Sequence, residues 1–198
     1  AITDADSNVA IGYEALTTNV LGSKSVAVGQ GSLSDQNPAS AADMYNTAVG
    51  FNAGASVTTG TSNTAVGALA LDGATTATHN TALGYNTMSA ATTGSYNTAV
   101  GSGVLSLHTT GASNTAVGYG AMADLTTGGN NTALGQDALA NITTTAGNTA
   151  IGKATLVASV TGSNNTALGY LALTACLDGG SNVAVGVSAL DANTAGSS

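Results

Sequence analysis

The five-residue segment Asn114-Thr115-Ala116-Val117-Gly118 is repeated along nearly the whole chain at a fixed spacing. If the last residue of each copy is taken as its reference glycine, the spacing is 17 residues except between Gly29 and Gly50, where it is 21. The eleven reference glycines are Gly12, Gly29, Gly50, Gly67, Gly84, Gly101, Gly118, Gly135, Gly152, Gly169 and Gly186. A repeat of this regularity constrains the fold more strongly than local secondary-structure propensity does.

The two residues before each reference glycine are apolar in every copy. Alanine always stands two positions before the glycine, and Val, Ile or Leu stands one position before it. Neighbouring side chains of a strand point to opposite faces, so the alanines form a column on one face of the sheet and the Val, Ile and Leu residues form a column on the other. One column faces the interior of the coil, and the other must be covered by a different part of the assembly. We expect the alanines to form an outer wall that is covered by sister chains. The alanines assigned to trimer or coil packing are Ala48, Ala65, Ala82, Ala99, Ala116, Ala133, Ala150 and Ala167.

An asparagine stands four positions before the reference glycine in ten copies, and Ser25 replaces it in the remaining one. Stacked amides can hydrogen-bond from rung to rung, as in cross-β assemblies; alternatively, each asparagine bonds its own backbone in a turn. The predicted asparagine ladder comprises Asn46, Asn63, Asn80, Asn97, Asn114, Asn131, Asn148 and Asn165. Large apolar residues four positions after the glycine, such as Leu71 and Met88, predict a further ladder that faces the interior.

The period of 17 residues accommodates two short strands and two turns, but not two helices. We therefore predict an all-β fold, a parallel β-solenoid in which each period forms one of eleven coils, as a rod of roughly 50 Å. A helical repeat is disfavoured by the 27 glycines and the abundant Thr and Asn. Disorder is disfavoured because 43% of the residues are hydrophobic and recur in phase.

Several copies resemble repeats of a known family. Ser7-Asn8-Val9-Ala10-Ile11-Gly12 and Ser181-Asn182-Val183-Ala184-Val185-Gly186 resemble the head repeat of trimeric autotransporter adhesins, and the Asn-Thr-Ala-Val/Leu-Gly copies are similar to repeats in bacteriophage fibre and decoration proteins. The resemblance implies a left-handed parallel β-roll, three chains side by side and a structural role on a surface or virion. The period of 17 and the Thr three positions before the glycine in eight copies depart from the head repeat.

The repeat predicts one elongated domain over residues 7–190, with tails at 1–6 and 191–198 and a four-residue insertion within 30–45. Only Lys24 and Lys153 are basic, and the formal net charge is −8. Such a chain is not expected to bind nucleic acid, because phosphate recognition needs a basic face. We also expect no membrane insertion, since there is no long apolar run, and a start without a secretion signal favours a particle protein over a secreted adhesin.

Residues capable of chemistry do not form a recurring pattern, and we expect no catalytic residues, no cofactor and no metal site. Cys176 is the single cysteine and is expected to fill space in a turn. His79 and His108 occupy different places in their repeats and are expected to be surface turn residues. The acidic residues Asp124, Asp137, Asp178 and Asp191 are out of phase with one another and form no periodic ion ladder.

Two features remain as candidate contact sites. Aromatic residues follow the reference glycine in five copies and could bind sugars or pack at an interface; they are Tyr13, Phe51, Tyr85, Tyr119 and Tyr170. The insertion is a candidate for partner contact through Asp35, Pro38 and Asp43, because loops on rigid scaffolds often carry binding.

The first functional hypothesis is a non-enzymatic, homotrimeric structural virion protein, either a capsid cement or decoration protein or a tail-fibre segment, contacting other structural proteins. The alternative is an adhesin or receptor-binding head on a bacterial surface, with a glycan receptor. An ice-binding solenoid is third, because the adjacent Thr-Thr pairs would point to opposite sides of a strand.

Overall fold

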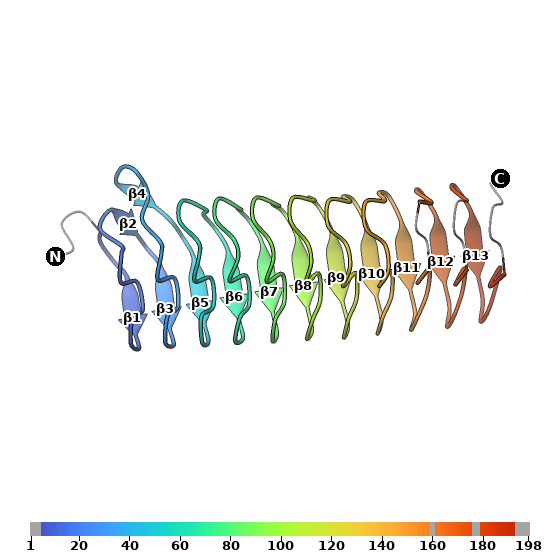
Figure 1. Ribbon diagram of the computed structural model, residues 1–198, viewed down its shortest axis with the longest axis horizontal. Coiled ribbons are helices and arrows are strands. Elements are labelled where there is room, and N and C mark those ends of the chain that lie inside the picture. The colour runs from blue at the N-terminus through green and yellow to red at the C-terminus, as the bar shows by residue number, and fades with distance from the viewer. Residues whose placement is uncertain (1–4, 159–160, 176–178, 193–198) are drawn as a thin grey trace.

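The computed structural model describes residues 5–158, 161–175 and 179–192. The chain winds into a rod of stacked coils that progress from the N-terminal to the C-terminal end (Figure 1). Within the described ranges the chain contains strands, turns and bends and no helix. The predicted parallel β-solenoid with a period of 17 residues is confirmed.

One strand from each coil joins a single eleven-stranded parallel sheet along the rod. Its strands, in spatial and sequence order, are β1 (Val9–Ile11), β3 (Val26–Val28), β5 (Thr47–Val49), β6 (Thr64–Val66), β7 (Thr81–Leu83), β8 (Thr98–Val100), β9 (Thr115–Val117), β10 (Thr132–Leu134), β11 (Thr149–Ile151), β12 (Thr166–Leu168) and β13 (Val183–Val185). Equivalent residues pair directly; Ala99 of β8, for example, lies opposite Ala116 of β9. The sequence repeat therefore fixes the register of the sheet.

The interior of each coil is filled by two apolar ladders. The alanine at the centre of each strand faces inward and is fully buried in the middle of the rod, as are Leu71, Met88, Leu105 and Met122 on the other side of the coil. The ladder four positions after the reference glycine is thus confirmed as internal. The expected outer alanine wall is wrong: these alanines pack within the coil because the strand and the Leu/Met ladder leave room only for a methyl group between them.

The expected second strand of each coil is replaced by turns in most of the rod. Hydrogen bonds between coils continue there, since the Leu71 N–H donates to the Thr87 carbonyl at 2.9 Å and the Thr75 N–H donates to the Thr92 carbonyl at 3.0 Å. The turns require left-handed backbone at residues that are not glycine, including Leu71 (φ 54°) and Met88 (φ 52°). Such conformations are uncommon for bulky residues, and here burial of the side chain offsets their cost.

The asparagine ladder runs along the interior and is confirmed as an arrangement between rungs. The backbone N–H of Asn97 donates to Oδ1 of Asn80 at 2.9 Å, and Asn97 Nδ2 donates to the same oxygen at 3.2 Å. Asn97 Nδ2 also donates to the Gly111 carbonyl of the next coil at 3.1 Å. Each amide thereby links three successive coils and satisfies backbone groups that would otherwise be buried without partners.

The insertion builds a second, two-stranded parallel sheet from β2 (Gly22–Ser23) and β4 (Ala42–Asp43). The loop at β4 projects beyond the outline of the other coils near the N-terminal end (Figure 1). In the same coil, Gln36 stands seven residues after Gly29 and directs its side chain into the interior, where it is fully buried. Gln36 Oε1 accepts hydrogen bonds from Ser25 Oγ at 3.1 Å and Asn46 Nδ2 at 2.9 Å, so it bridges the position at which Ser25 interrupts the asparagine ladder.

Candidate interaction surfaces

The outer face of the main sheet carries two parallel columns of side chains. One column is the aliphatic residue before each reference glycine, which is exposed in six coils, by 44% at Leu83 and 66% at Val185 for example, and half-buried in the other five. The other column is the residue three positions before the glycine, which is threonine in eight consecutive strands. These strand threonines are Thr47, Thr64, Thr81, Thr98, Thr115, Thr132, Thr149 and Thr166.

This face differs from both expectations derived from the sequence. The apolar ladder that lacks a cover is aliphatic and not alanine. The strand threonines also alternate with the aliphatic residues on one side of the sheet, so the adjacent Thr-Thr pairs used as an argument against an ice-binding face lie elsewhere, in the turns. The face is therefore a regular surface of two columns, threonine and aliphatic, and each column repeats once per strand along the rod.

A second surface follows the reference glycines, where the aromatic residues stand. Their side chains are exposed, by 58% at Tyr85 and 65% at Tyr119. From Tyr13 to Tyr119 they occur in every second coil, and the coils between them carry Gln30, Ala68 and Ser102 at the same position. Between Tyr85 and Tyr119 the surface is hollowed, with a volume of about 450 Å³.

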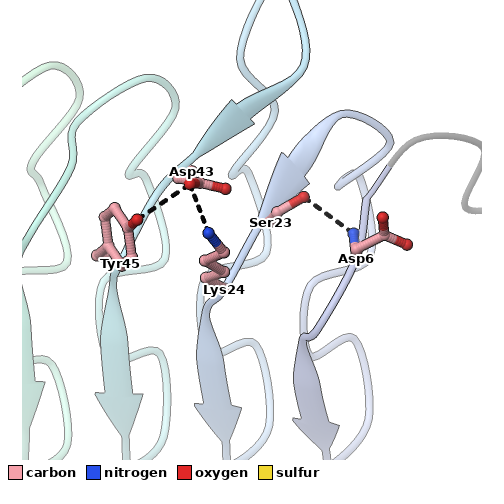
Figure 2. Close-up of polar contacts among 5 residues, drawn as sticks. All are labelled: Asp6, Ser23, Lys24, Asp43 and Tyr45. Atoms are coloured by element: carbon pink, nitrogen blue, oxygen red, sulfur yellow. Dashed lines mark hydrogen bonds and ion pairs between the residues drawn. The ribbon is translucent and has the colours of Figure 1, made fainter.

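A polar cluster lies at the junction of the insertion with the first coils. Asp43 accepts a hydrogen bond from Lys24 Nζ at 2.7 Å and another from the Tyr45 hydroxyl at 3.0 Å, as Figure 2 shows. The Lys24 ammonium also lies 5.4 Å from the centre of the Tyr45 ring. The bond from Lys24 lowers the pKa of Asp43, and the bond to Asp43 raises the pKa of Lys24. In the same view the Asp6 backbone N–H donates to Ser23 Oγ at 2.9 Å.

The three residues predicted for partner contact lie in different environments. Asp35 is exposed, Pro38 is buried, and Asp43 is held by Lys24 and Tyr45. The structure brings Asp43 together with Lys24 and Tyr45. Asp43 and Pro38 do not form a shared accessible surface, because Pro38 is buried. Of the three predicted contact residues, Asp35 alone is exposed and not engaged in an ion pair with another described residue.

The two histidines differ in burial, and the expectation that both lie on the surface is wrong for His108. His79 is exposed and stacks on Tyr96, with ring centres 5.0 Å apart. His108 is fully buried, and neither ring nitrogen has a hydrogen-bond partner within the described part of the chain. Burial lowers the pKa of His108. The ring fits because Gly94 and Gly111 in adjacent coils leave space for it.

Other sequence-based candidates give no reactive site. In residues 5–158, 161–175 and 179–192, no group of three His, Cys, Asp or Glu side chains is arranged to hold a metal ion. Cys176 and Asp178 lie outside the described residues. The described segments also contain no helix of the length and hydropathy needed to cross a bilayer.

Sequence reasoning missed Gln36, the burial of His108 and the hollow beside Gly103. One signal could have revealed the first two: both occupy the place seven residues after a reference glycine, which in other coils holds Val57, Ala74 or Leu125. An apolar column of that kind predicts an internal position.

The chain matches no family model, no curated protein and no solved structure.

Proposed function

We propose that this chain is a non-enzymatic structural protein of a virion, three copies of which associate side by side as a capsid cement or decoration protein or as a segment of a fibre. The observation that supports this proposal is the exposed aliphatic column on a straight, regular sheet. Soluble monomers rarely leave a continuous apolar strip of such extent in contact with water. The number of three copies rests on the resemblance to adhesin-head and phage repeats.

The outer face suits association along its whole length. Each coil presents a Val, Leu or Ile at the equivalent strand position, so every additional coil contributes a similar contact to a neighbouring chain. The strand threonines beside the aliphatic column supply hydroxyls for hydrogen bonds at the edge of such an interface. A rod built in this way gains stiffness without requiring any catalytic group.

The first test is the mass of the native particle in solution. We expect a species of three times the 18.8 kDa of one chain. A Leu134→Asp substitution places a charge in the aliphatic column and should convert the trimer to monomers, whereas Gln136→Asp, two positions away on an exposed turn, should leave it intact. A wild-type monomer would contradict the proposal.

The second test concerns the virion. Imaging of purified particles should place the rods on the shell if the chain is a decoration protein and along an appendage if it is a fibre segment. Absence of the chain from purified particles would exclude both roles and favour the adhesin or receptor-binding alternative.

The column of strand threonines favours one further candidate, an ice-binding solenoid. Eight hydroxyl and methyl pairs repeat at the strand spacing of about 4.8 Å on one face. This use requires an uncovered face, so it competes directly with the trimer. A monomeric chain that shows thermal hysteresis, lost on Thr115→Lys and retained on Ser113→Lys, would support ice binding; a trimer without hysteresis would eliminate it.

A further inference from the structure

The hollow beside Gly103 lies between two exposed tyrosines on consecutive aromatic-bearing coils. Tyr85 and Tyr119 are two coils apart, a separation of about 10 Å at the normal strand spacing. Their rings border a space of about 450 Å³, and Ser102 and Gly103 of the intervening coil form part of its lining. The volume falls within the usual range for sites that hold small molecules.

The hollow lies where two successive coils have glycine, Gly103 and Gly120, at a position that carries a side chain in most other coils. Gly103 has φ 66°, and a Cβ atom added there would meet no atom within 4 Å. Equivalent positions elsewhere carry large residues with the same backbone conformation, namely Leu69 (φ 57°) and Leu171 (φ 57°). The space is therefore a local feature of residues 85–141 and not a property of every coil.

The lining combines apolar ring faces with carboxylates and amides. Asn86 and Asn141 contribute amide groups, and Asp124 and Asp137 contribute carboxylates. Gln136 Nε2 donates to Asp137 Oδ2 at 2.9 Å, which holds one side of that carboxylate in place. Aromatic faces pack against the C–H faces of pyranose rings, while carboxylates and amides bond pairs of neighbouring hydroxyls.

We propose that the Tyr85–Tyr119 hollow binds a neutral saccharide, of the length of a disaccharide, with one sugar ring against each tyrosine. The two carboxylates and the net charge of −8 disfavour sialic acid and other anionic sugars. The site lies within one chain. It deepens the adhesin alternative and does not rest on trimer formation or on a virion role.

The decisive experiment fills the hollow without altering the fold. Gly103→Leu introduces a side chain that Leu69 and Leu171 already place at the same backbone conformation. Asn52→Leu is the matched control, because it introduces the same side chain at the equivalent position of another coil, outside the hollow. The probe is an array of immobilised neutral hexose mono- and disaccharides beside sialylated ones, tested with the native full chain.

We expect binding to at least one neutral disaccharide and none to the sialylated spots. Binding should fall by about tenfold or more with Tyr85→Ala or Tyr119→Ala, which corresponds to about 1.4 kcal/mol, and should be lost with Gly103→Leu. It should persist with Tyr170→Ala and Asn52→Leu, and circular dichroism will check that each variant is folded. The proposal is overturned if no neutral saccharide binds at millimolar concentration or if binding survives Gly103→Leu. Both outcomes are independent of the native mass.

Discussion

The rung at Ser25 and the rungs from Asn63 onward obtain the same hydrogen bonds in different ways. From Asn63 to Asn165, each asparagine backbone N–H donates to Oδ1 of the asparagine in the previous coil, and each Nδ2 donates to a backbone carbonyl further along the chain, as at Asn80. At Ser25 the side chain is too short for this. Gln36, at a position that is apolar in most other coils, points inward, and its Oε1 accepts from both Ser25 Oγ and Asn46 Nδ2.

This difference indicates which property of the repeat is necessary. The identity of the residue can change and the spacing can lengthen from 17 to 21, provided that a buried polar side chain still completes the ladder. Buried backbone groups without partners are costly. Substitutions in the asparagine ladder therefore allow the regular rungs and the rung at Ser25 to be compared by the change in the free energy of unfolding.

Removing a regular rung should have the largest effect. Asn114→Ala deletes the bonds from Nδ2 to Asn97 Oδ1 and the Gly128 carbonyl, and it leaves the Asn131 N–H without an acceptor. We expect a loss of about 3–5 kcal/mol in the free energy of unfolding, measured by denaturant titration. Thr115→Ala, on the outer face next to it, should change stability by less than about 0.5 kcal/mol. Equal effects of the two substitutions would show that the asparagine ladder contributes no more to the free energy of unfolding than an exposed threonine does.

The buried histidine should be the next strongest determinant within the regular region. Replacing His108 with Leu, the residue at the same place in the next coil (Leu125), removes two buried nitrogens without partners and should stabilise the chain by about 1–3 kcal/mol.

The same residue predicts a pH dependence. Since burial lowers the pKa of His108 from its ordinary value of 6.5, the unfolded state binds a proton more readily than the folded state does. Stability should fall as the pH is lowered below about 6.5 and continue to fall until the lower folded pKa is reached, by at most about 1.4 kcal/mol per pH unit. Unfolding titrations from neutral to mildly acidic pH should show this slope in the wild type and in His79→Ala. A slope that persists in His108→Leu would exclude His108 as its source.

A substitution at the irregular rung should have a smaller effect than one at a regular rung. Gln36→Met keeps the volume but removes the acceptor for Ser25 and Asn46, while Asn46 Nδ2 still donates to the Gly60 carbonyl at 2.8 Å. The substitution also removes Gln36 Nε2, a buried nitrogen without a hydrogen-bond partner in the described part of the chain, and this offsets part of the cost. We therefore expect a loss of about 1 kcal/mol or less in the free energy of unfolding, measured by denaturant titration. If Gln36→Met is as stable as the wild type, the bonds to Gln36 do not stabilise the ladder at this rung.

The smallest effect is expected at the surface of the same region. Asp43→Asn removes the ion pair with Lys24, but both side chains are largely in contact with water, with exposed fractions of 43% and 47%. Exposed pairs contribute little to stability. The midpoint of thermal unfolding should stay unchanged within experimental error; a marked decrease would mean that the small sheet of β2 and β4 depends on this contact.

The period allowed most of the fold to be predicted, because the reference glycines alone fix the number of coils and the pairing of strands. At Gly84, for instance, φ is 134° and an added Cβ atom would lie 2.2 Å from the Gly101 carbonyl oxygen, so only glycine fits. The inward direction of the alanines could not be deduced in the same way. Alternation places Ala116 and Val117 on opposite faces but does not say which face is internal.

The surface features could not be predicted for a related reason. Sequence reasoning left open whether Tyr85 and Tyr119 bind sugars or pack at an interface, because it did not show the surface between them. In the folded rod an open space lies between them, above Gly103. Likewise, left-handed backbone at Leu71 is contrary to residue preference and follows only from packing in the coil.

The uniform joint between successive coils has a consequence for how such a rod changes in evolution. Since Asn97, Asn114 and Asn131 repeat the same bonds in the same register, a duplication or deletion of one 17-residue unit would leave every remaining joint intact. The length of the molecule would then change in steps of about 4.8 Å. Gene rearrangement could thus change the length of this rod through the number of repeat units alone, without any change in the sequence of a unit.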